Sequence, residues 1–163
     1  MNKLATVLLI SILLIGAVGV TGCVEEEGPP ETYTPTTLVI QFGDDGGSIG
    51  TGNTTTWNYV DGEWDVSSAD GGGETTYVFL NISADDCLGQ LDYAADVAGF
   101  DIDKSYFSVP GGWLVEGIDG LETEVPGPAW QFWVNGEYSS YSADQIDLVE
   151  GDEVEWRYQL SAF

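Results

Sequence analysis

The sequence contains no histidine, only two cysteines and only three lysines and arginines among its 163 residues. Without histidine, the chain lacks the usual general base near neutral pH and the Ser-His and Cys-His arrangements of nucleophilic catalysis. Without histidine or a cysteine cluster, a zinc or other transition-metal site is not expected either. These absences argue against an enzyme and favour a binding or structural role.

Basic charge is scarce beside 28 acidic residues, which gives the chain a formal net charge of −25 at pH 7. Phosphate backbones and anionic lipid headgroups would be repelled, so neither nucleic acid nor an anionic lipid surface is an expected partner. Pairs of carboxylates must arise by chance in such a chain. Most of them are expected to form a solvated surface.

The first 22 residues have the pattern of an export signal. Lys3 precedes an almost wholly apolar run over residues 4–20, and small residues lead up to Cys23. Val20-Thr21-Gly22-Cys23 resembles the lipobox of prokaryotic lipoproteins, in which the cysteine is lipidated and becomes the new N-terminus. The alternative is an uncleaved membrane anchor, although the run is slightly short of the ~20 residues that a span needs. We therefore expect a signal peptide at 1–22 and a lipid-anchored protein on the extracytoplasmic face of the cell membrane.

An acidic, proline-rich stretch at 23–37 predicts an extended linker, and residues 38–163 then form one domain. Side-chain alternation predicts strands at 38–42, 76–82, 107–109, 113–115, 130–134 and 154–158. Ser83 is expected to cap a helix that contains Cys87, as a buried and inert thiol, and ends at Gly99. The fold class is thus α+β and mainly β, with one helix packed on a mixed sheet. A β-grasp-like arrangement is the specific expectation.

Four segments carry a family resemblance. They read W-x-F-x-V-N-G-E at 130–137, E-G-D-E-V-E-W-R-Y at 150–158, a helix pattern at 87–100 and G-W-L-V-E-G-I-D-G-L at 112–121. Over residues 38–158 the chain resembles the transcobalamin-like C-terminal domain family. The resemblance implies a β-grasp-like domain and, as ligand, cobalamin or a related corrinoid. In the vitamin B12 carriers that domain is one half of a clamp.

Residues 44–74 are an expected insertion relative to that family's short connection. Most of the stretch is rich in Gly, Asp, Ser and Thr and predicts surface loops. Within it, Asp61-Gly62 predicts a two-residue hairpin turn that would place Tyr59 opposite Trp64.

Aromatic residues are abundant, with six tryptophans and eight tyrosines. Those on the apolar faces of the last two strands are expected in the core: Trp130, Phe132, Trp156 and Tyr158. A second set has no packing period that requires burial, and exposed rings on a β-rich domain often form a contact surface. These candidate ligand-binding residues are Trp133, Tyr138, Tyr141, Trp57 and Trp64. For Trp133, packing beneath the helix is an equally weighted alternative.

Two weaker patterns involve oxygen ligands and glycans. Asp44, Asp45 and Asp61 lie in Gly-rich turns and are weak calcium candidates, because the EF-hand spacing is missing. Asn53 begins an Asn-Thr-Thr acceptor pattern for N-glycosylation.

The sequence therefore predicts a lipid-anchored cell-surface binding module for a corrinoid or another flat organic ligand, and not an enzyme. The alternative is a structural or adhesive surface domain that contacts cell-wall polymer or a partner protein through exposed aromatic residues.

The lipid anchor is testable by Cys23→Ser. The variant should be released from the membrane or remain as unprocessed precursor, because the acylated thiol would be missing. Fractionation with mass measurement of the membrane-bound form checks this. A variant that stays in the membrane at the mature mass would show that Cys23 is not the anchor.

Overall fold

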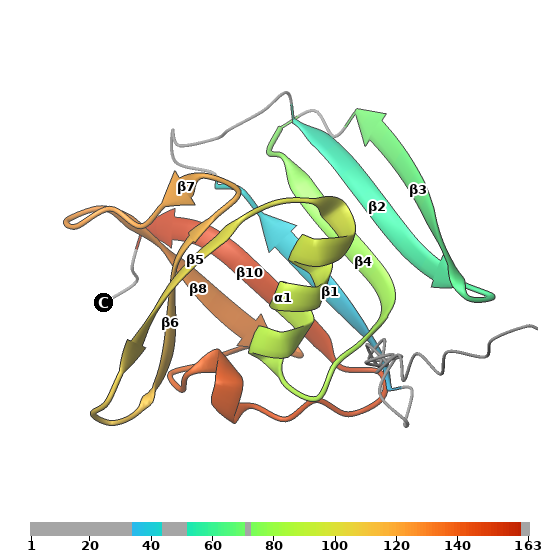
Figure 1. Cartoon of the computed structure of the whole chain (residues 1–163). Helices are drawn as coiled ribbons and strands as arrows, with labels where there is room; N and C mark the ends of the chain where they lie inside the picture. Colours follow the sequence, from blue (N-terminus) through green and yellow to red (C-terminus); the bar gives the residue numbers. More distant parts are fainter. Residues whose placement is uncertain (1–33, 44–51, 71–72, 161–163) are drawn as a thin grey trace, which may run out of the picture.

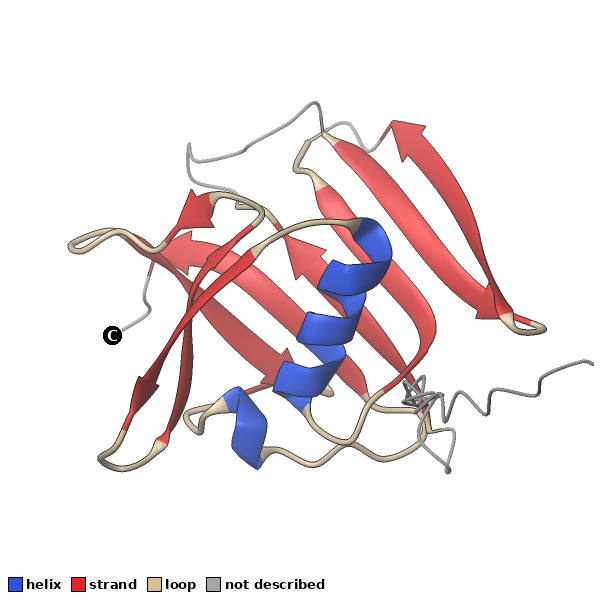
Figure 2. Ribbon diagram, in the orientation of Figure 1, coloured by secondary structure: helices blue, strands red, loops and turns tan. Residues whose placement is uncertain are grey.

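The computed structural model describes residues 34–43, 52–70 and 73–160. Most of these residues lie in β-strands. Seven strands form one mixed sheet in the order β3-β2-β4-β1-β10-β8-β9 (Figures 1 and 2). Neighbours pair in antiparallel fashion except β1 with β10 and β2 with β4, which are parallel. The strands of this main sheet are β1 (Pro35–Gln41), β2 (Asn53–Val60), β3 (Glu63–Asp70), β4 (Thr76–Ser83), β8 (Pro128–Val134), β9 (Glu137–Tyr138) and β10 (Glu153–Leu160).

The remaining elements lie over one face of that sheet (Figure 1). They are the helix α1 (Cys87–Ala98) and a second sheet of three strands. The second sheet contains β5 (Ile102–Phe107), β6 (Gly112–Ile118) and β7 (Leu121–Glu122), and a short 3-10 turn η1 (Ala143–Gln145) precedes β10. The expectation of an α+β, mainly β fold with a helix on a mixed sheet is confirmed, while the β-grasp-like description stays a prediction.

The core lies between the main sheet and these covering elements. Leu38 and Ile40 of β1 are fully buried, and Val154 and Trp156 lie beside them on β10. The same face continues onto β8 through Phe132, whose ring stacks on Trp156 with centroids 4.9 Å apart. The predicted alternation of the last two strands is therefore confirmed. It arises because successive strand residues point to opposite faces, and only one face is covered.

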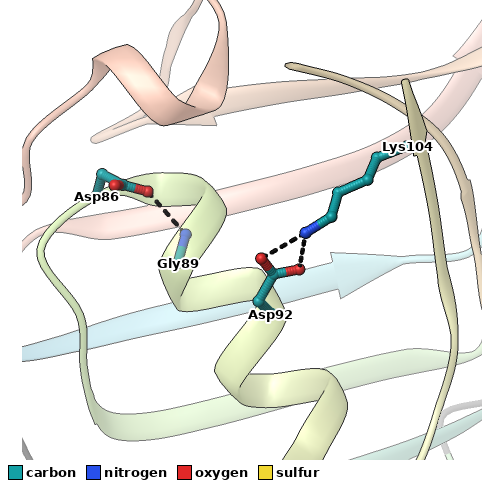
Figure 3. Close-up of polar contacts among 4 residues, drawn as sticks. All are labelled: Asp86, Gly89, Asp92 and Lys104. Atoms are coloured by element: carbon teal, nitrogen blue, oxygen red, sulfur yellow. Dashed lines mark hydrogen bonds and ion pairs between the residues drawn. The ribbon is translucent and has the colours of Figure 1, made fainter. Parts of the chain in front are cut away.

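The helix begins one turn later than expected. Asp86, not Ser83, is the N-cap, and its carboxylate accepts a hydrogen bond from Gly89 N at 2.7 Å (Figure 3). Ser83 belongs to β4 and is buried there. The helix ends at Gly99 as predicted, with a left-handed φ of 77° and its N–H bonded to Ala95 O.

Several other boundaries differ from expectation. Residues 53–56 and 67–70 were expected to be loop, but they extend the hairpin about Asp61-Gly62 into two strands of eight residues each. β5 spans Ile102–Phe107, while 108–111 form the turn that was expected to contain a strand. β1 already begins at Pro35, within the expected linker. In each case backbone pairing with a neighbouring strand determines the boundary, and that neighbour is not visible in local composition.

Three hydrogen bonds fasten the second sheet to the main sheet. Trp130 Nε1 donates to Leu121 O at 2.7 Å, and the Tyr158 hydroxyl donates to Glu122 O at 2.7 Å. In the turn between β6 and β7, the Asp119 carboxylate accepts a hydrogen bond from the Tyr77 hydroxyl at 2.8 Å. Burial, followed by this bond to a carboxylate, raises the pKa of Tyr77 to about 12. Tyr77 therefore stays a donor throughout the physiological range of pH.

Among the described residues, no helix is long and apolar enough to cross a membrane. Cys87 is fully buried at the start of α1 and forms no disulfide. Burial, with Asp86 and Asp152 nearby, raises the pKa of its thiol to about 12. The thiol is thus held in its unreactive, protonated form, as the sequence predicted.

Trp156→Ala tests the core. The substitution should lower the free energy of unfolding by about 3–5 kcal/mol, because Trp156 is nearly fully buried and its removal leaves a cavity beside Phe132. Chemical denaturation of the domain provides the measurement. An unchanged midpoint would place Trp156 outside the core.

Candidate functional site

A cavity opens between the tip of the β5–β6 hairpin and the segment that follows β8. Its volume is about 360 Å³. The hairpin supplies one wall, with Phe107, Val109 and Trp113, and Tyr138 and Tyr141 supply the opposite wall. The floor is the buried face of the main sheet, at Trp130, Phe132 and Trp156. We refer to this site as the aromatic cavity.

None of the residues that line the aromatic cavity carries a charge, in a chain with 28 acidic residues. The lining consists of aromatic and aliphatic side chains together with serines, glycines, one glutamine and one proline. Its rim is open to solvent, since Val109 is 85% exposed and Tyr141 is 68% exposed. Exposed apolar side chains gathered around a concave surface are typical of a binding site.

A group of polar contacts, which we call the clasp, holds the two walls together. Ser142 Oγ donates to Trp113 O at 2.7 Å, and Gln145 Nε2 donates to Gly111 O at 2.7 Å. The Asp144 carboxylate accepts from Trp113 N at 3.1 Å and from the Ser142 hydroxyl. The clasp joins the hairpin turn to η1, so the walls of the cavity come from two segments about 30 residues apart in sequence.

The clasp favours the ionised form of Asp144. The hydrogen bond from Ser142, and to a smaller extent that from Trp113 N, holds the pKa of Asp144 below its usual value. A carboxyl whose pKa is lowered by folding stabilises the fold above its unfolded pKa, and this contribution is lost as the pH falls through the lowered value. The clasp is therefore complete at neutral pH.

The lysine beside the cavity wall is already paired. Lys104 Nζ on β5 binds the Asp92 carboxylate of α1, with a distance of 2.6 Å to Oδ1 (Figure 3). The same ammonium lies 5.7 Å from the centroid of the Trp113 ring. Lys104 thus ties the second sheet to the helix and supports Trp113 from outside the lining of the cavity.

The structure separates the five aromatic candidates. Tyr138 and Tyr141 line the cavity, whereas Trp133 does not. Trp133 lies on the face of β8 opposite the core, so it does not pack beneath α1 either. Its ring contacts the Tyr138 ring, with centroids 5.6 Å apart. The Arg157 guanidinium lies over the other ring of this pair, that of Trp133, with its central carbon 4.3 Å from the ring centroid.

The hairpin tryptophans lie away from the cavity. Trp57 stacks on Phe79 with ring centroids 4.7 Å apart, and Trp64 meets the same ring edge-on at 6.4 Å. Both are half-buried against the core cluster. They were expected on an exposed surface, but β2 pairs with β4 and thereby extends the covered face of the sheet beneath them.

The remaining candidates stay predictions. Cys23, Asp44 and Asp45 lie outside the described residues, and Asp61 occupies the exposed turn between β2 and β3. In the described part of the chain, no group of three or more acidic or cysteine side chains is placed to hold a metal ion. Asn53 is the first residue of β2 and is half-exposed.

The sequence prediction did not include the hairpin wall. Phe107, Val109 and Leu114 are exposed apolar residues around a Pro-Gly-Gly turn, and all three line the cavity. Large apolar residues on both sides of a turn were the available signal, since turns are normally polar. The sequence could not indicate that this turn faces Tyr138 and Tyr141.

Comparisons with known proteins give partial matches. A family described as a domain of unknown function (DUF4430) matches residues 92–160, which is less than half of the chain. That range includes β5 to β10 and every residue of the aromatic cavity. A search of curated proteins finds no match.

Two solved structures are similar to parts of the chain. One is a candidate metal-binding protein from Ruminococcus gnavus, 16% identical, with a TM-score of 0.38, over 67% of this chain and 95% of that chain. The other is haptocorrin in complex with Cbi, 16% identical, with a TM-score of 0.41, over 67% of this chain and 25% of that chain. The ligands named belong to those proteins.

Gly112→Ala tests the clasp. Gly112 has a φ of 140°, and an added Cβ would lie 2.5 Å from Ser142 Cβ, so alanine must push the hairpin away from the opposite wall. Gly136→Ala is the matched control, because Gly136 has a φ of 79° and open space around it. Gly112→Ala should cost roughly 1–3 kcal/mol more in unfolding free energy than the control, as overpacking does. Equal losses in chemical denaturation would show that the two walls are not in close contact at this point.

Proposed function

We propose that the aromatic cavity binds a flat, uncharged organic molecule and that the chain is a binding module at the cell surface. The observation that supports this most directly is an uncharged, aromatic cavity in a protein of net charge −25. Aromatic walls favour flat ligands because ring faces offer large contact areas with specific geometry. The negative field of the chain disfavours anionic ligands.

The size of the cavity suggests how such a ligand is held. A volume of about 360 Å³ lies at the lower end of the roughly 300–1,000 Å³ typical of ligand sites. A small ring system would fit within it, whereas a macrocycle would enter at one edge and leave its other face uncovered. A large ligand would therefore bind weakly to this chain alone and more tightly if a second chain covered the exposed face.

A corrinoid is the ligand to test first. The motifs at 130–137 and 150–158 resemble the transcobalamin-like family, and these strands carry the floor of the cavity. A corrinoid is flat and much larger than the cavity. Only one edge of it would enter, and the rest would protrude into solvent. Dicyanocobinamide is a suitable probe because its colour permits direct quantification.

The location and the lack of catalysis are part of the same proposal. The lipobox-like pattern ending at Cys23 would anchor the chain by lipid outside the cytoplasm, and the linker would hold the cavity away from the membrane. A sequence without histidine offers no common general base, so capture without chemistry is the simplest role.

A partner protein or cell-wall polymer is the alternative occupant. Val109 and Tyr141 are 85% and 68% exposed at the rim of the cavity, and Tyr106, whose ring contacts Trp113, is 59% exposed. This is more apolar surface than a buried small ligand needs. The adhesive alternative would therefore use the exposed aromatic and aliphatic residues of this rim.

The proposal is tested with the double variant Tyr138→Ser/Tyr141→Ser. Removing both rings from one wall should weaken binding of dicyanocobinamide at least tenfold, as measured by equilibrium dialysis. The unfolding free energy should change by less than about 1 kcal/mol, because both side chains are exposed.

Val66→Ser serves as the control, since Val66 is 59% exposed on β3 and remote from the cavity. It should bind like the wild type. Unchanged binding by the folded double variant would move the site elsewhere. Binding of smaller neutral rings but not of the corrinoid would keep the cavity and reject the corrinoid.

A further inference from the structure

The β5–β6 hairpin ends in an exposed apolar segment without charge. Residues 105–115, which we call the hairpin tip, contain no acidic or basic side chain. Phe107 and Leu114 are exposed on its strands, and Val109 is exposed in its turn. Turns are normally polar, and exposed apolar side chains gathered in one place indicate contact with another molecule or with a membrane.

Both faces of the hairpin tip are apolar. Tyr106 lies opposite Trp113 in the pairing of β5 with β6, and their rings are in contact with centroids 5.5 Å apart. Alternation along the strands places Phe107 and Leu114 on the other face of the ribbon. All four side chains are exposed. A partner protein would cover one face of such a ribbon, whereas a lipid interface surrounds an inserted tip and contacts both faces.

The kinds of side chain at the tip are those found where a protein enters a lipid interface. Tyrosine and tryptophan, here Tyr106 and Trp113, have an apolar ring with a polar end and are enriched at the level of the headgroups. Phe107 and Val109 lie nearer the turn and have no polar end. Apolar residues of this kind enter the boundary between headgroups and acyl chains.

The hairpin tip lies at the same end of the molecule as the start of β1. The β5–β6 turn and the beginning of β1 both lie along the lower edge of Figure 1. One segment touches both, since Gln145 Nε2 donates to Gly111 O at 2.7 Å and Gly151 N donates to Pro35 O at 2.9 Å. The chain from 145 to 151 spans at most ~22 Å when fully extended. The tip is therefore close to the point where the chain enters the sheet.

A lipid on Cys23 would bring this end of the molecule to the membrane. The chain from Cys23 to Thr34 can reach at most ~40 Å, which keeps the start of β1 near the surface. The segment beside the tip carries Asp147, Glu150 and Asp152, in a chain of net charge −25. Anionic headgroups would repel this end, whereas zwitterionic headgroups carry no net charge.

We propose that the hairpin tip inserts into the headgroup region of a zwitterionic lipid surface and is a second membrane contact of the anchored chain. The inference rests on the lipid anchor of the proposed function and adds to it a contact made by the folded domain. The tip is also one wall of the aromatic cavity. The cavity would therefore open beside the headgroups, and a ligand would enter it from the lipid–water interface.

Two added tryptophans report where the tip lies. Val109→Trp places the probe in the hairpin turn, and Val66→Trp places it on β3 as the matched control, because both valines are exposed. The full acylated chain is reconstituted on phosphatidylcholine vesicles, with and without lipid brominated near the headgroup end of its acyl chains. Bromine should quench the emission that Val109→Trp adds, and that emission should be shifted to the blue. The emission added by Val66→Trp should be neither quenched nor shifted.

A second pair of variants tests whether the apolar side chains cause the insertion. Phe107→Ser/Val109→Asp puts a charge on the tip, which is costly at membrane depth. It should lower the quenching of Trp113 roughly twofold or more, whereas Val66→Asp should leave it unchanged. The emission of Trp113 is taken as the component that Trp113→Phe lacks. At a fixed content of brominated lipid, added phosphatidylglycerol should also lower the quenching, because the acidic chain is repelled.

The anchor and the tip are measured separately. Flotation with the vesicles reports the anchor, and wild type that does not float would remove the surface location and the inference together. If wild type floats but the probe in Val109→Trp is not quenched, the anchor stands and the inference is overturned, which leaves the tip for a protein or polymer partner. Undiminished quenching in Phe107→Ser/Val109→Asp would overturn it as well. Equal quenching with phosphatidylglycerol present would overturn the choice of zwitterionic lipid. Should Val109→Trp not fold, the quenching of Trp113 in the wild type decides alone.

Discussion

The arrangement of this domain depends on two aromatic side chains of the main sheet that hold the second sheet by its backbone. Trp130 and Tyr158 lie side by side on β8 and β10, and each donates its one hydrogen to a carbonyl of β7. The rings supply apolar contact to the core while their polar ends satisfy backbone groups that would otherwise be buried without partners. Because β7 is thereby fixed, the β5–β6 hairpin is directed over the edge of the sheet, where it becomes a wall of the cavity.

Strong acidity and an uncharged site coexist because the charges lie elsewhere on the surface. The outward face of β10 carries Glu153, Glu155 and Arg157, whereas its inward face carries Val154, Trp156 and Tyr158. Alternation along one strand thus separates a solvated, charged face from the face that forms the floor of the cavity. The charge favours solubility, and the cavity offers a neutral surface within a negative field. This combination is the basis for proposing neutral flat molecules, rather than anionic ones, as ligands.

The two walls of the cavity are joined at one end by the clasp, and the rim of the cavity is open to solvent. The clasp fixes the hairpin turn to η1 through Ser142, Asp144 and Gln145, so the spacing of the walls does not depend on a ligand. Above it, rings such as Tyr141 are exposed to solvent. A buried floor with an exposed aromatic rim is consistent with the proposed ligand, which would be larger than the space enclosed.

The sequence by itself determined the local features. Alternation identified the inward faces of β8 and β10, Asp61-Gly62 identified a hairpin, and Gly99 marked the end of α1. Each follows from properties of one residue or one short segment, such as side-chain direction and tolerance of positive φ.

Only the tertiary structure decided what those segments face. That β10 pairs in parallel with β1, that β2 extends the sheet beneath Trp57, and that Phe107 and Val109 meet Tyr138 and Tyr141 are all contacts between distant parts of the chain. Such contacts follow from the total burial of apolar surface, which no local window contains. Whether Trp156 Nε1 finds a partner is decided in the same way. The indole is visible in the sequence, but the carbonyl that satisfies Trp130, and the lack of an acceptor for Trp156 among the described residues, exist only once the second sheet is in place.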